Sequence, residues 1–280
     1  MPDSARYATA TRRQQRFPIA SGPVEVVDVR RVARRLTRIV VAGDVLATMP
    51  DDEPGEFVTL IWPRDGQEVL VPEVGRWRFP PGGEAQHARN YTVRRFDRDA
   101  GRMTIDLVIH DHEPDPEDPD GGFGGRWAAR ARVGERLGLC GPRIHWVTDP
   151  DAAWTLMAGD ETAIPAIAAA VERRPAGHPI RVVLDVHDAD DEAMLDVASP
   201  DLDVTWLHRG DAPCATPERL VAALRELELP EGPPQLWAAG ESWAVRGVRE
   251  HLRDERGFPR GAIQALGYWK HRATPEDDEA

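Results

Sequence analysis

The sequence predicts a two-domain chain, a small antiparallel β-barrel followed by a five-stranded parallel α/β domain. Apolar runs up to about residue 139 are short and are interrupted by Gly, Pro and Asp. From about Pro150 onward, strand-like runs alternate with helix-like runs. The 280 residues are enough for about two domains of roughly 150 residues each. We expect domains at residues 20–150 and 151–270, and a disordered acidic tail at 271–280.

Six runs in the first part have the length and alternation of half-buried strands. They lie at residues 24–32, 36–43, 56–63, 90–96, 103–110 and 135–142. The segment 64–86 is rich in Pro and Gly, so we expect an irregular excursion there. Six short strands with few helices are typical of a small antiparallel barrel or sandwich.

The second part alternates strands and helices, which indicates βαβ units and a parallel sheet. Strands are predicted at 154–159, 179–188, 202–210, 234–240 and 262–269, and helices at 162–174, 190–198, 216–227 and 241–257. Thr216 is the expected N-cap of the third helix, with Pro217 in its first turn. The continuous apolar run Val182–Leu184 is typical of a sheet that is covered on both faces.

Composition excludes several classes of function. The formal net charge of -13 argues against a broad nucleic-acid or anionic-membrane surface. No apolar run approaches 18 residues, so we expect a cytoplasmic protein without membrane insertion. The two cysteines, Cys140 and Cys214, are too few for an iron–sulfur cluster, which normally takes four cysteine ligands. If the chain transfers electrons, an organic cofactor must do so.

Ligands of open parallel sheets bind beyond the carboxyl ends of the strands. Those ends are predicted at residues 158–162, 186–190, 208–212, 238–242 and 267–271. The sequence has no G-x-G-x-x-G, which counts against a Rossmann fingerprint but not against phosphate binding at a strand-to-helix turn. Some Gly and Asp residues at these ends are simply turn and cap residues.

The strand RNYTVR, residues 89–94, brings chemically useful residues together. The forked guanidinium of Arg89 suits a pyrophosphate, and the ring of Tyr91 suits stacking on a flat ligand. Thr92 lies on the opposite face of an ideal strand, so a bulge or twist would be needed to bring all three to one ligand. The residues alone leave a flavin or nucleotide site and ordinary strand decoration equally open.

Several segments resemble the siderophore-interacting protein family, FAD-containing ferric-siderophore reductases of the ferredoxin-reductase superfamily. In chain order they are RRLTRIVVAGDVL (34–46), FVTLIWP (57–63), RNYTVRRFD (89–97), GGRWAARARVGERLGLCGPR (124–143), GDETAIPAI (159–167), VTWLHR (204–209), LWAAGE (236–241) and GYW (267–269). The resemblance covers about residues 24–270. It departs from the family at residues 111–120, an acidic insert before the phosphate-binding segment.

The resemblance implies roles for individual residues. Arg89 would bind the FAD pyrophosphate, with Asn90 beside it, Tyr91 would lie against the isoalloxazine or ribityl chain, Thr92 would bond near N5, and His110 would lie near the flavin. The other implied cofactor contacts are Gly125, Arg126 and Trp127 at the pyrophosphate, Asp160 and Thr162 at the domain junction, Gly240 and Glu241 on the nicotinamide path, and Tyr268 and Trp269 beside the flavin. Thr92 and Trp269 are the implied catalytic positions.

The family implies electron transfer from NAD(P)H through FAD to siderophore-bound Fe(III), releasing Fe(II). The iron is then substrate, and we predict no metal site in the protein, since the prolines around His110 and His112 favour a solvated loop. Lys270, His271 and Arg272 are the candidate contacts for an anionic ferric siderophore, although a solvated strand end explains them equally well. Alternatives are a general NAD(P)H–flavin reductase with a protein acceptor, and a siderophore carrier without redox activity.

The electron donor is the least determined part of the prediction. Asp188, Asp190 and Asp191 follow the second parallel strand, where carboxylates suit a ribose 2′-hydroxyl and repel a 2′-phosphate. Arg209 follows the third strand and is a candidate contact for a 2′-phosphate. These residues favour NADH slightly over NADPH, and a ferredoxin-like donor remains the alternative.

Overall fold

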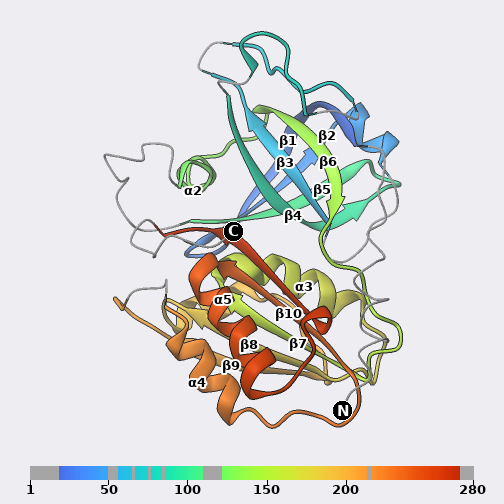
Figure 1. Ribbon diagram of the computed structural model, residues 1–280. Helices are drawn as coiled ribbons and strands as arrows, with labels where there is room; N and C mark the ends of the chain where they lie inside the picture. Colours follow the sequence, from blue (N-terminus) through green and yellow to red (C-terminus); the bar gives the residue numbers. More distant parts are fainter. Residues whose placement is uncertain are drawn as a thin grey trace. The chain divides into compact units, whose positions relative to one another are not determined.

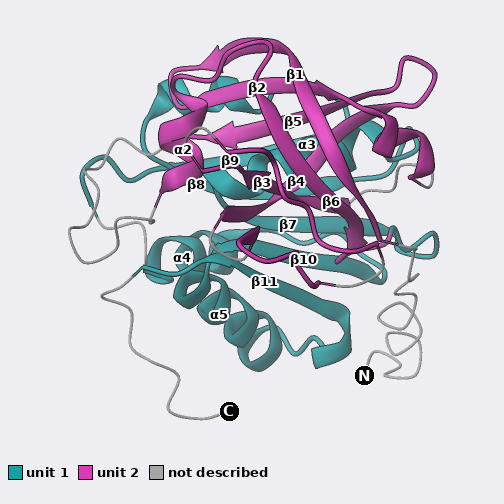
Figure 2. Cartoon of the chain, turned by 90° about the horizontal axis from the view of Figure 1, so that it is seen from above, with its two compact units in different colours: residues 1–13, 148–280 teal, residues 14–147 magenta. Residues whose placement is uncertain are grey.

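The computed structural model describes residues 19–49, 56–64, 67–74, 77–83, 86–109, 122–212 and 216–271 (Figure 1). The chain divides into two compact units between Val147 and Thr148, coloured separately in Figure 2. We call residues 14–147 the barrel unit and the part from residue 148 onward the α/β unit. No helix within the described residues has both the length and the apolar character needed to cross a bilayer.

The barrel unit is a closed antiparallel barrel of six strands, as the sequence predicted. Its strands are β1 (Ala20–Ala33), β2 (Leu36–Ala42), β3 (Glu56–Trp62), β4 (His87–Asp97), β5 (Arg102–Val108) and β6 (Arg136–Ile144), in the order β1-β2-β5-β4-β3-β6. A 3-10 turn, η1 (Asp44–Thr48), follows β2, and one short helix, α2 (Phe123–Ala128), precedes β6. Alternate strand residues fill the interior, where Val26, Ile39, Leu60 and Ile105 are fully buried.

A buried ion pair lies within the barrel unit. Arg38 on β2 pairs in register with Asp106 on β5 and donates two hydrogen bonds of 2.7 Å to its carboxylate. Arg94 Nε lies 3.8 Å from the same carboxylate, and its side chain is fully buried. The pairing of β4 with β5 is irregular between Val93 and Arg95, and such a bulge changes the direction of the side chains beside it.

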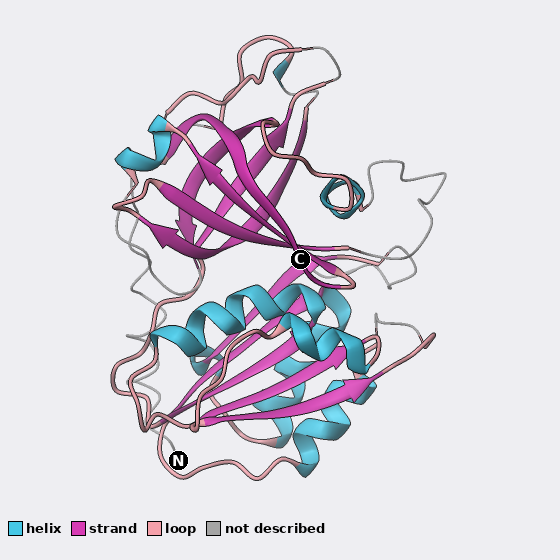
Figure 3. Ribbon diagram, turned by 180° about the vertical axis from the view of Figure 1, so that it is seen from behind, coloured by secondary structure: helices cyan, strands magenta, loops and turns pink. Residues whose placement is uncertain are grey.

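The α/β unit is a five-stranded parallel sheet, also as predicted. Its strands are β7 (Trp154–Asp160), β8 (Ile180–Val186), β9 (Leu202–His208), β10 (Pro234–Glu241) and β11 (Ile263–Trp269), in the order β11-β10-β7-β8-β9. The helices are α3 (Ile164–Arg173), α4 (Glu218–Glu226) and α5 (Ser242–Glu250), and they cover both faces of the sheet (Figure 3). Every residue of β7 and β10 is buried, which explains their nearly unbroken apolar sequences.

Two local predictions in the α/β unit were wrong, and a third helix is present but changes its type near its end. The helix expected at 190–198 is a short 3-10 segment, η4 (Ala189–Met194), because the Asp188 carboxylate accepts the Asp190 N–H and closes a tight turn. The N-cap of α4 is Pro217 rather than Thr216, without a side-chain capping bond. The helix expected to reach 257 continues after α5 as a π-helical turn, η5 (His251–Glu255). The remaining 3-10 turns are η3 (Glu161–Ala163) and η6 (Arg260–Ala262).

The buried ion pair gives a prediction about stability. Asp106→Asn removes the charge that two buried guanidinium groups share, so we expect the variant to lose roughly 3–5 kcal/mol of unfolding free energy. Urea unfolding followed by tryptophan fluorescence measures the loss. Asp254→Asn is the matched control, because Asp254 pairs with Arg253 at the surface and such pairs contribute little. Equal stability of the two variants would contradict the prediction.

Candidate functional site

Strand β4 has an open backbone edge at the position of the RNYTVR motif. It pairs with β3 residue for residue from His87 to Thr92, but it pairs with β5 only from Val93 onward. Within the described chain, residues 90–92 therefore have a strand partner on one side only. Alternate N–H and C=O groups of this edge are available to a ligand, since unpaired backbone groups are strong hydrogen-bonding sites.

Tyr91 packs directly against the backbone of Gly124 in helix α2. A Cβ atom at position 124 would lie 1.7 Å from the Tyr91 hydroxyl oxygen, so only glycine allows this approach. The ring of Tyr91 meets that of Trp62 edge-on, with ring centroids 6.0 Å apart. Burial raises the pKa of Tyr91 above its ordinary value, while the nearby charge of Arg89 lowers it. The phenol therefore stays protonated at neutral pH and can donate a hydrogen bond.

Aromatic contacts hold helix α2 against β3 and β4. The ring of Trp62 lies 5.4 Å from those of both Phe123 and Trp127, and His87 stacks on Phe123 at 3.9 Å. The indole nitrogen of Trp62 is buried and has no hydrogen-bond partner within the described residues. The cradle around Gly124, the open edge of β4 and this orphaned donor together fit a flat, polar-edged cofactor such as FAD.

The other residues of the motif lie on two faces of β4. Arg89 is exposed and donates from Nη1 to the carbonyl of Ala88 at 2.9 Å. Asn90 and Thr92 lie opposite Thr59 and Phe57 on β3. The register is regular through Thr92, and the bulge comes only after Val93. The structure thus keeps Thr92 on the face opposite Tyr91, and a ligand that meets both must reach Thr92 through its backbone or around the strand edge.

Arg143 on β6 is a further candidate site residue, which the sequence analysis missed. Its guanidinium lies 4.7 Å from the ring of Phe57 and 5.7 Å from that of Trp77, and it donates to the Asn90 side chain at 3.1 Å. The Thr59 hydroxyl donates to the same Asn90 oxygen at 2.7 Å. No signal in the sequence pointed to Arg143, because its partners come from β3, β4 and the 64–86 excursion.

In the α/β unit, the ends of β7 and β10 form the point where the strand order reverses. The chain proceeds from β7 to β8 on one side and from β10 to β11 on the other, and ligands bind in the crevice at such a point. A Cβ at Gly159 would lie 2.1 Å from the carbonyl oxygen of Ala239, and one at Gly240 would lie 2.5 Å from the Asp160 carboxylate. Gly240 also has a φ of 141°. These two glycines allow the strand ends to approach closely.

The carboxylate of Asp160 joins three strand ends. It accepts the backbone N–H and the hydroxyl of Thr162, the Glu241 N–H at 2.8 Å and the indole N–H of Trp269 at 3.0 Å. Asp160 is only 5% exposed. Its hydrogen-bonding capacity is directed into the protein, so its contribution here is to shape the turns.

Glu241 has a similar inward orientation. One carboxylate oxygen accepts the N–H groups of Trp243 and Ala244 and caps helix α5, at 2.7 and 3.0 Å. The other accepts the backbone N–H of His271 at 3.1 Å. Glu241 is fully buried, so the segment after β11 is fixed to the start of α5.

A network of buried charges lies at the carboxyl ends of β7, β8 and β9. Arg209 donates to the carboxylate of Glu161 and, at 2.9 Å, to the backbone carbonyl of Asp185. Glu161 also accepts the His187 N–H at 3.0 Å, and Asp185 accepts from Arg219 at 2.7 Å. Burial raises the pKa of Glu161 to about 7, partly offset by the charge of Arg209. Burial likewise raises the pKa of Asp185, against the opposing effect of Arg219.

The residues at the end of β11 are more exposed. Tyr268 is 39% exposed and meets Trp237 edge-on at 6.3 Å. Lys270 and His271 are exposed, and the His271 ring lies 6.5 Å from that of Trp269. The predicted site residues His110 and Arg272, and the acidic insert 111–120, lie outside the described residues.

Comparison with known proteins supports both halves of the fold. Residues 25–146 match the family model described as siderophore-interacting FAD-binding domain, and residues 152–272 match the model described as siderophore-interacting protein. The chain belongs to the siderophore-interacting protein family. Within it, the chain is 32% identical to the ferric vibriobactin reductase ViuB of Vibrio cholerae over 267 residues, covering 90% of each chain.

Solved structures agree with this membership. A siderophore utilization protein from T. fusca is 37% identical, with a TM-score of 0.80 over 95% of this chain and 99% of that one. The siderophore-interacting protein SipS of Aeromonas hydrophila is 26% identical, with a TM-score of 0.68 over 90% and 99%. The ferredoxin reductase of carbazole 1,9a-dioxygenase shares the fold at 21% identity and a TM-score of 0.64, covering 90% of this chain and 70% of that one.

Asp160 offers a direct test of the α/β site. All the groups that its carboxylate accepts are N–H or O–H donors, so Asp160→Asn turns an amide NH₂ toward donors. We expect a loss of roughly 1–3 kcal/mol for each donor left buried and unsatisfied, measured by thermal unfolding.

Asp188→Asn is the control for this variant, because an asparagine oxygen still accepts the Asp190 N–H that closes its turn. A shift in indole fluorescence confined to Asp160→Asn would report release of Trp269. An Asp160→Asn variant as stable as the wild type would show that the hydrogen bonds contribute nothing to stability.

Proposed function

We propose that this protein is a ferric-siderophore reductase that passes electrons from NAD(P)H through FAD to siderophore-bound Fe(III). The observation behind the proposal is the cradle formed by Tyr91, Gly124 and the open edge of β4, in a chain that is 32% identical to a ferric vibriobactin reductase. In this proposal the barrel unit binds FAD and the α/β unit binds the nicotinamide.

In this proposal, different residues of the barrel unit contact different parts of FAD. The guanidinium of Arg89 and the N–H of Gly125 in α2 bind the pyrophosphate, since such donors suit phosphate oxygens. The Arg126 N–H donates to the carbonyl of Gly122 at 3.1 Å, so Arg126 contributes its side chain, and Trp127 holds α2 by packing on Trp62. Tyr91 lies against the ring system or the ribityl chain and donates its hydroxyl proton. Thr92 offers its hydroxyl or its N–H to N5. Asn90 acts indirectly, since its amide oxygen is engaged by Thr59 and Arg143.

The cofactor supplies the redox chemistry, because a flavin takes up a hydride and releases electrons one at a time. The protein need not bind the iron directly. Hard oxygen donors hold Fe(III) more strongly than Fe(II), so reduction weakens the chelate. In this proposal the protein leaves the flavin edge exposed and attracts an anionic chelate, for which Lys270, His271 and Arg272 are the candidate cations.

A spectrum followed by anaerobic mixing tests the proposal. Purified protein should show flavin absorbance or take up added FAD. The flavin absorbance should bleach on addition of NADH or NADPH. A ferric chelate should then restore the flavin absorbance, while an added Fe(II) indicator forms its coloured complex. Absence of flavin uptake would favour a carrier without redox activity. Slow reoxidation by chelates but fast reoxidation by a redox protein would favour a general reductase.

Arg89 is the first residue to test in the FAD site. Arg89→Ala removes a charge-assisted contact worth roughly 1.5–3 kcal/mol, so FAD should bind at least about tenfold more weakly while the barrel stays folded. Arg95→Ala is the matched control, an exposed arginine further along β4. Titration of the apoprotein with FAD measures both. Wild-type affinity in Arg89→Ala would remove this residue from the site.

For the donor we propose NADH. Arg209, the candidate contact for a 2′-phosphate, is bound to Glu161 and to the Asp185 carbonyl, and its side chain is 11% exposed. Glu161→Gln weakens this hold, so reduction of the flavin by NADPH should gain several-fold relative to NADH in stopped-flow measurements. Glu192→Gln is the control, because Glu192 pairs with His208 at the same edge but at the surface.

The pH dependence adds a second readout. Because the pKa of Glu161 is raised to about 7, the carboxylate becomes neutral as the pH falls through that value and loses its attraction for Arg209. The wild-type preference for NADH should therefore weaken between about pH 8 and about pH 6. Titration of the 2′-phosphate affects wild type and Glu161→Gln alike, so their difference isolates Glu161. Faster wild-type reduction by NADPH at high pH would contradict the proposal, and no reduction by either nucleotide would indicate a ferredoxin-like donor.

A further inference from the structure

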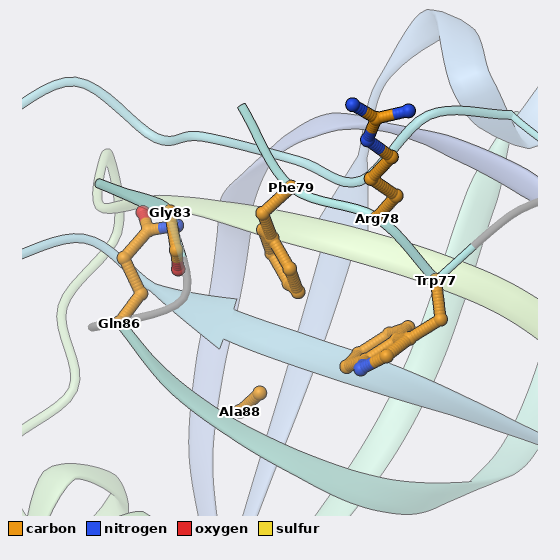
Figure 4. A pocket seen from close by; sticks show the side chains of 6 residues that line it. All are labelled: Trp77, Arg78, Phe79, Gly83, Gln86 and Ala88. Carbon is orange, nitrogen blue, oxygen red and sulfur yellow. The ribbon is translucent and has the colours of Figure 1, made fainter. Parts of the chain in front are cut away.

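A pocket of about 330 Å³ opens on the surface of the barrel unit (Figure 4). Its lining residues are Trp77, Arg78, Phe79, Gly83, Gln86 and Ala88. The rings of Trp77 and Phe79 lie edge to face with centroids 5.1 Å apart. Trp77 is 55% exposed, although burial of a tryptophan is strongly favourable. An exposed tryptophan beside a pocket of this size is typical of a binding site.

The walls of the pocket are held in place by internal contacts. Gln86 is 9% exposed; its amide accepts the Leu70 N–H at 3.0 Å and donates to the carbonyls of Leu70 and Gly83 at 2.7 and 3.1 Å. A Cβ at Gly83 would lie 2.8 Å from the ring of Phe79, so this ring packs on the glycine backbone. The irregular excursion is thus fixed at two points, and a ligand need not order these walls on binding.

The charge around the pocket is positive. Arg143 lies with its guanidinium 5.7 Å from the ring of Trp77, and Arg78 is itself a lining residue. Figure 4 shows the Arg78 guanidinium directed away from the Trp77 and Phe79 rings. Among the described residues that line the pocket none is acidic, despite the net charge of -13 for the whole chain. Aromatic walls with cations at the margin favour a flat aromatic ligand that carries negative charge.

We propose that this pocket binds an aromatic ring of an anionic ferric chelate, so that the protein selects aryl chelates, of catecholate or phenolate type, over hydroxamates. Ferric tris-catecholates carry negative charge and present their rings outward. Ferric trihydroxamates are uncharged, and those with aliphatic arms offer no ring to Trp77 or Phe79. The inference rests on the proposed function for the identity of the ligand as an iron chelate.

Binding of redox-inert gallium chelates tests the pocket without electron transfer. The probes are gallium(III) tris-catecholate and gallium(III) tris-acetohydroxamate, titrated by calorimetry into the FAD-loaded full chain. Trp77→Ala should weaken catecholate binding about tenfold and leave any hydroxamate binding unchanged, whereas Trp77→Phe should keep most of the affinity. Val133→Ala removes an apolar side chain that is 62% exposed in the same unit, and it should have no effect.

Three results would overturn the inference. The first is equal weakening of both probes in Trp77→Ala, or no weakening, and the second is absence of catecholate binding by the wild type. The third is catecholate binding by the apoprotein that FAD abolishes, which would assign the pocket to the cofactor. Reduction of a ferric chelate by the wild type is measured separately. Failure of that reaction alone counts against the proposed function, and failure of the gallium titration alone counts against the pocket.

Discussion

A single buried carboxylate, that of Asp160, determines how the carboxyl ends of the central strands meet. It accepts donors from its own turn, from Glu241 after β10 and from Trp269 at the end of β11. These bonds require close approach of the backbone, which Gly159 and Gly240 permit. The glycines that the sequence places at these turns are thus explained by contact between strands. A G-x-G-x-x-G motif is not needed for this geometry, because the strand ends are held by a side chain.

In the barrel unit, a glycine makes room for a side chain instead of for a neighbouring backbone. There a glycine, Gly124, receives a side chain, and the hydroxyl of Tyr91 lies where any other residue would place a Cβ. Trp62 contacts both Tyr91 and the rings of α2, so the strand motif and the helix are fixed as one body. Trp62 and Asp160, which hold the two sites together, are buried, whereas Arg89 is exposed and lies outside the core packing.

The sequence predicted the fold well because both of its periodicities are strong. The alternation along β1 indicates a half-buried strand, and the short apolar run of β10 between turn residues indicates a strand covered on both faces. Local side-chain bonds were less predictable, and the Asp188 cap converts an expected helix into a 3-10 turn. Arg143 could not be found from the sequence, because Phe57, Asn90 and Trp77 are brought to it by strand register and by an excursion without periodicity.

A net negative charge on the protein would repel an anionic chelate. This repulsion is weak when most of the charges lie far from the pocket. At physiological salt, exposed charges are screened over about 8–10 Å, so most of the net charge of -13 has little effect at one surface pocket. The charges at the pocket are those of Arg143 and Arg78, and the lining residues that the structure describes include no carboxylate. Because an electron can pass without a bond between protein and iron, recognition is limited to the outer surface of the chelate. Ring shape and local charge are then the properties by which such a protein can distinguish one chelate from another.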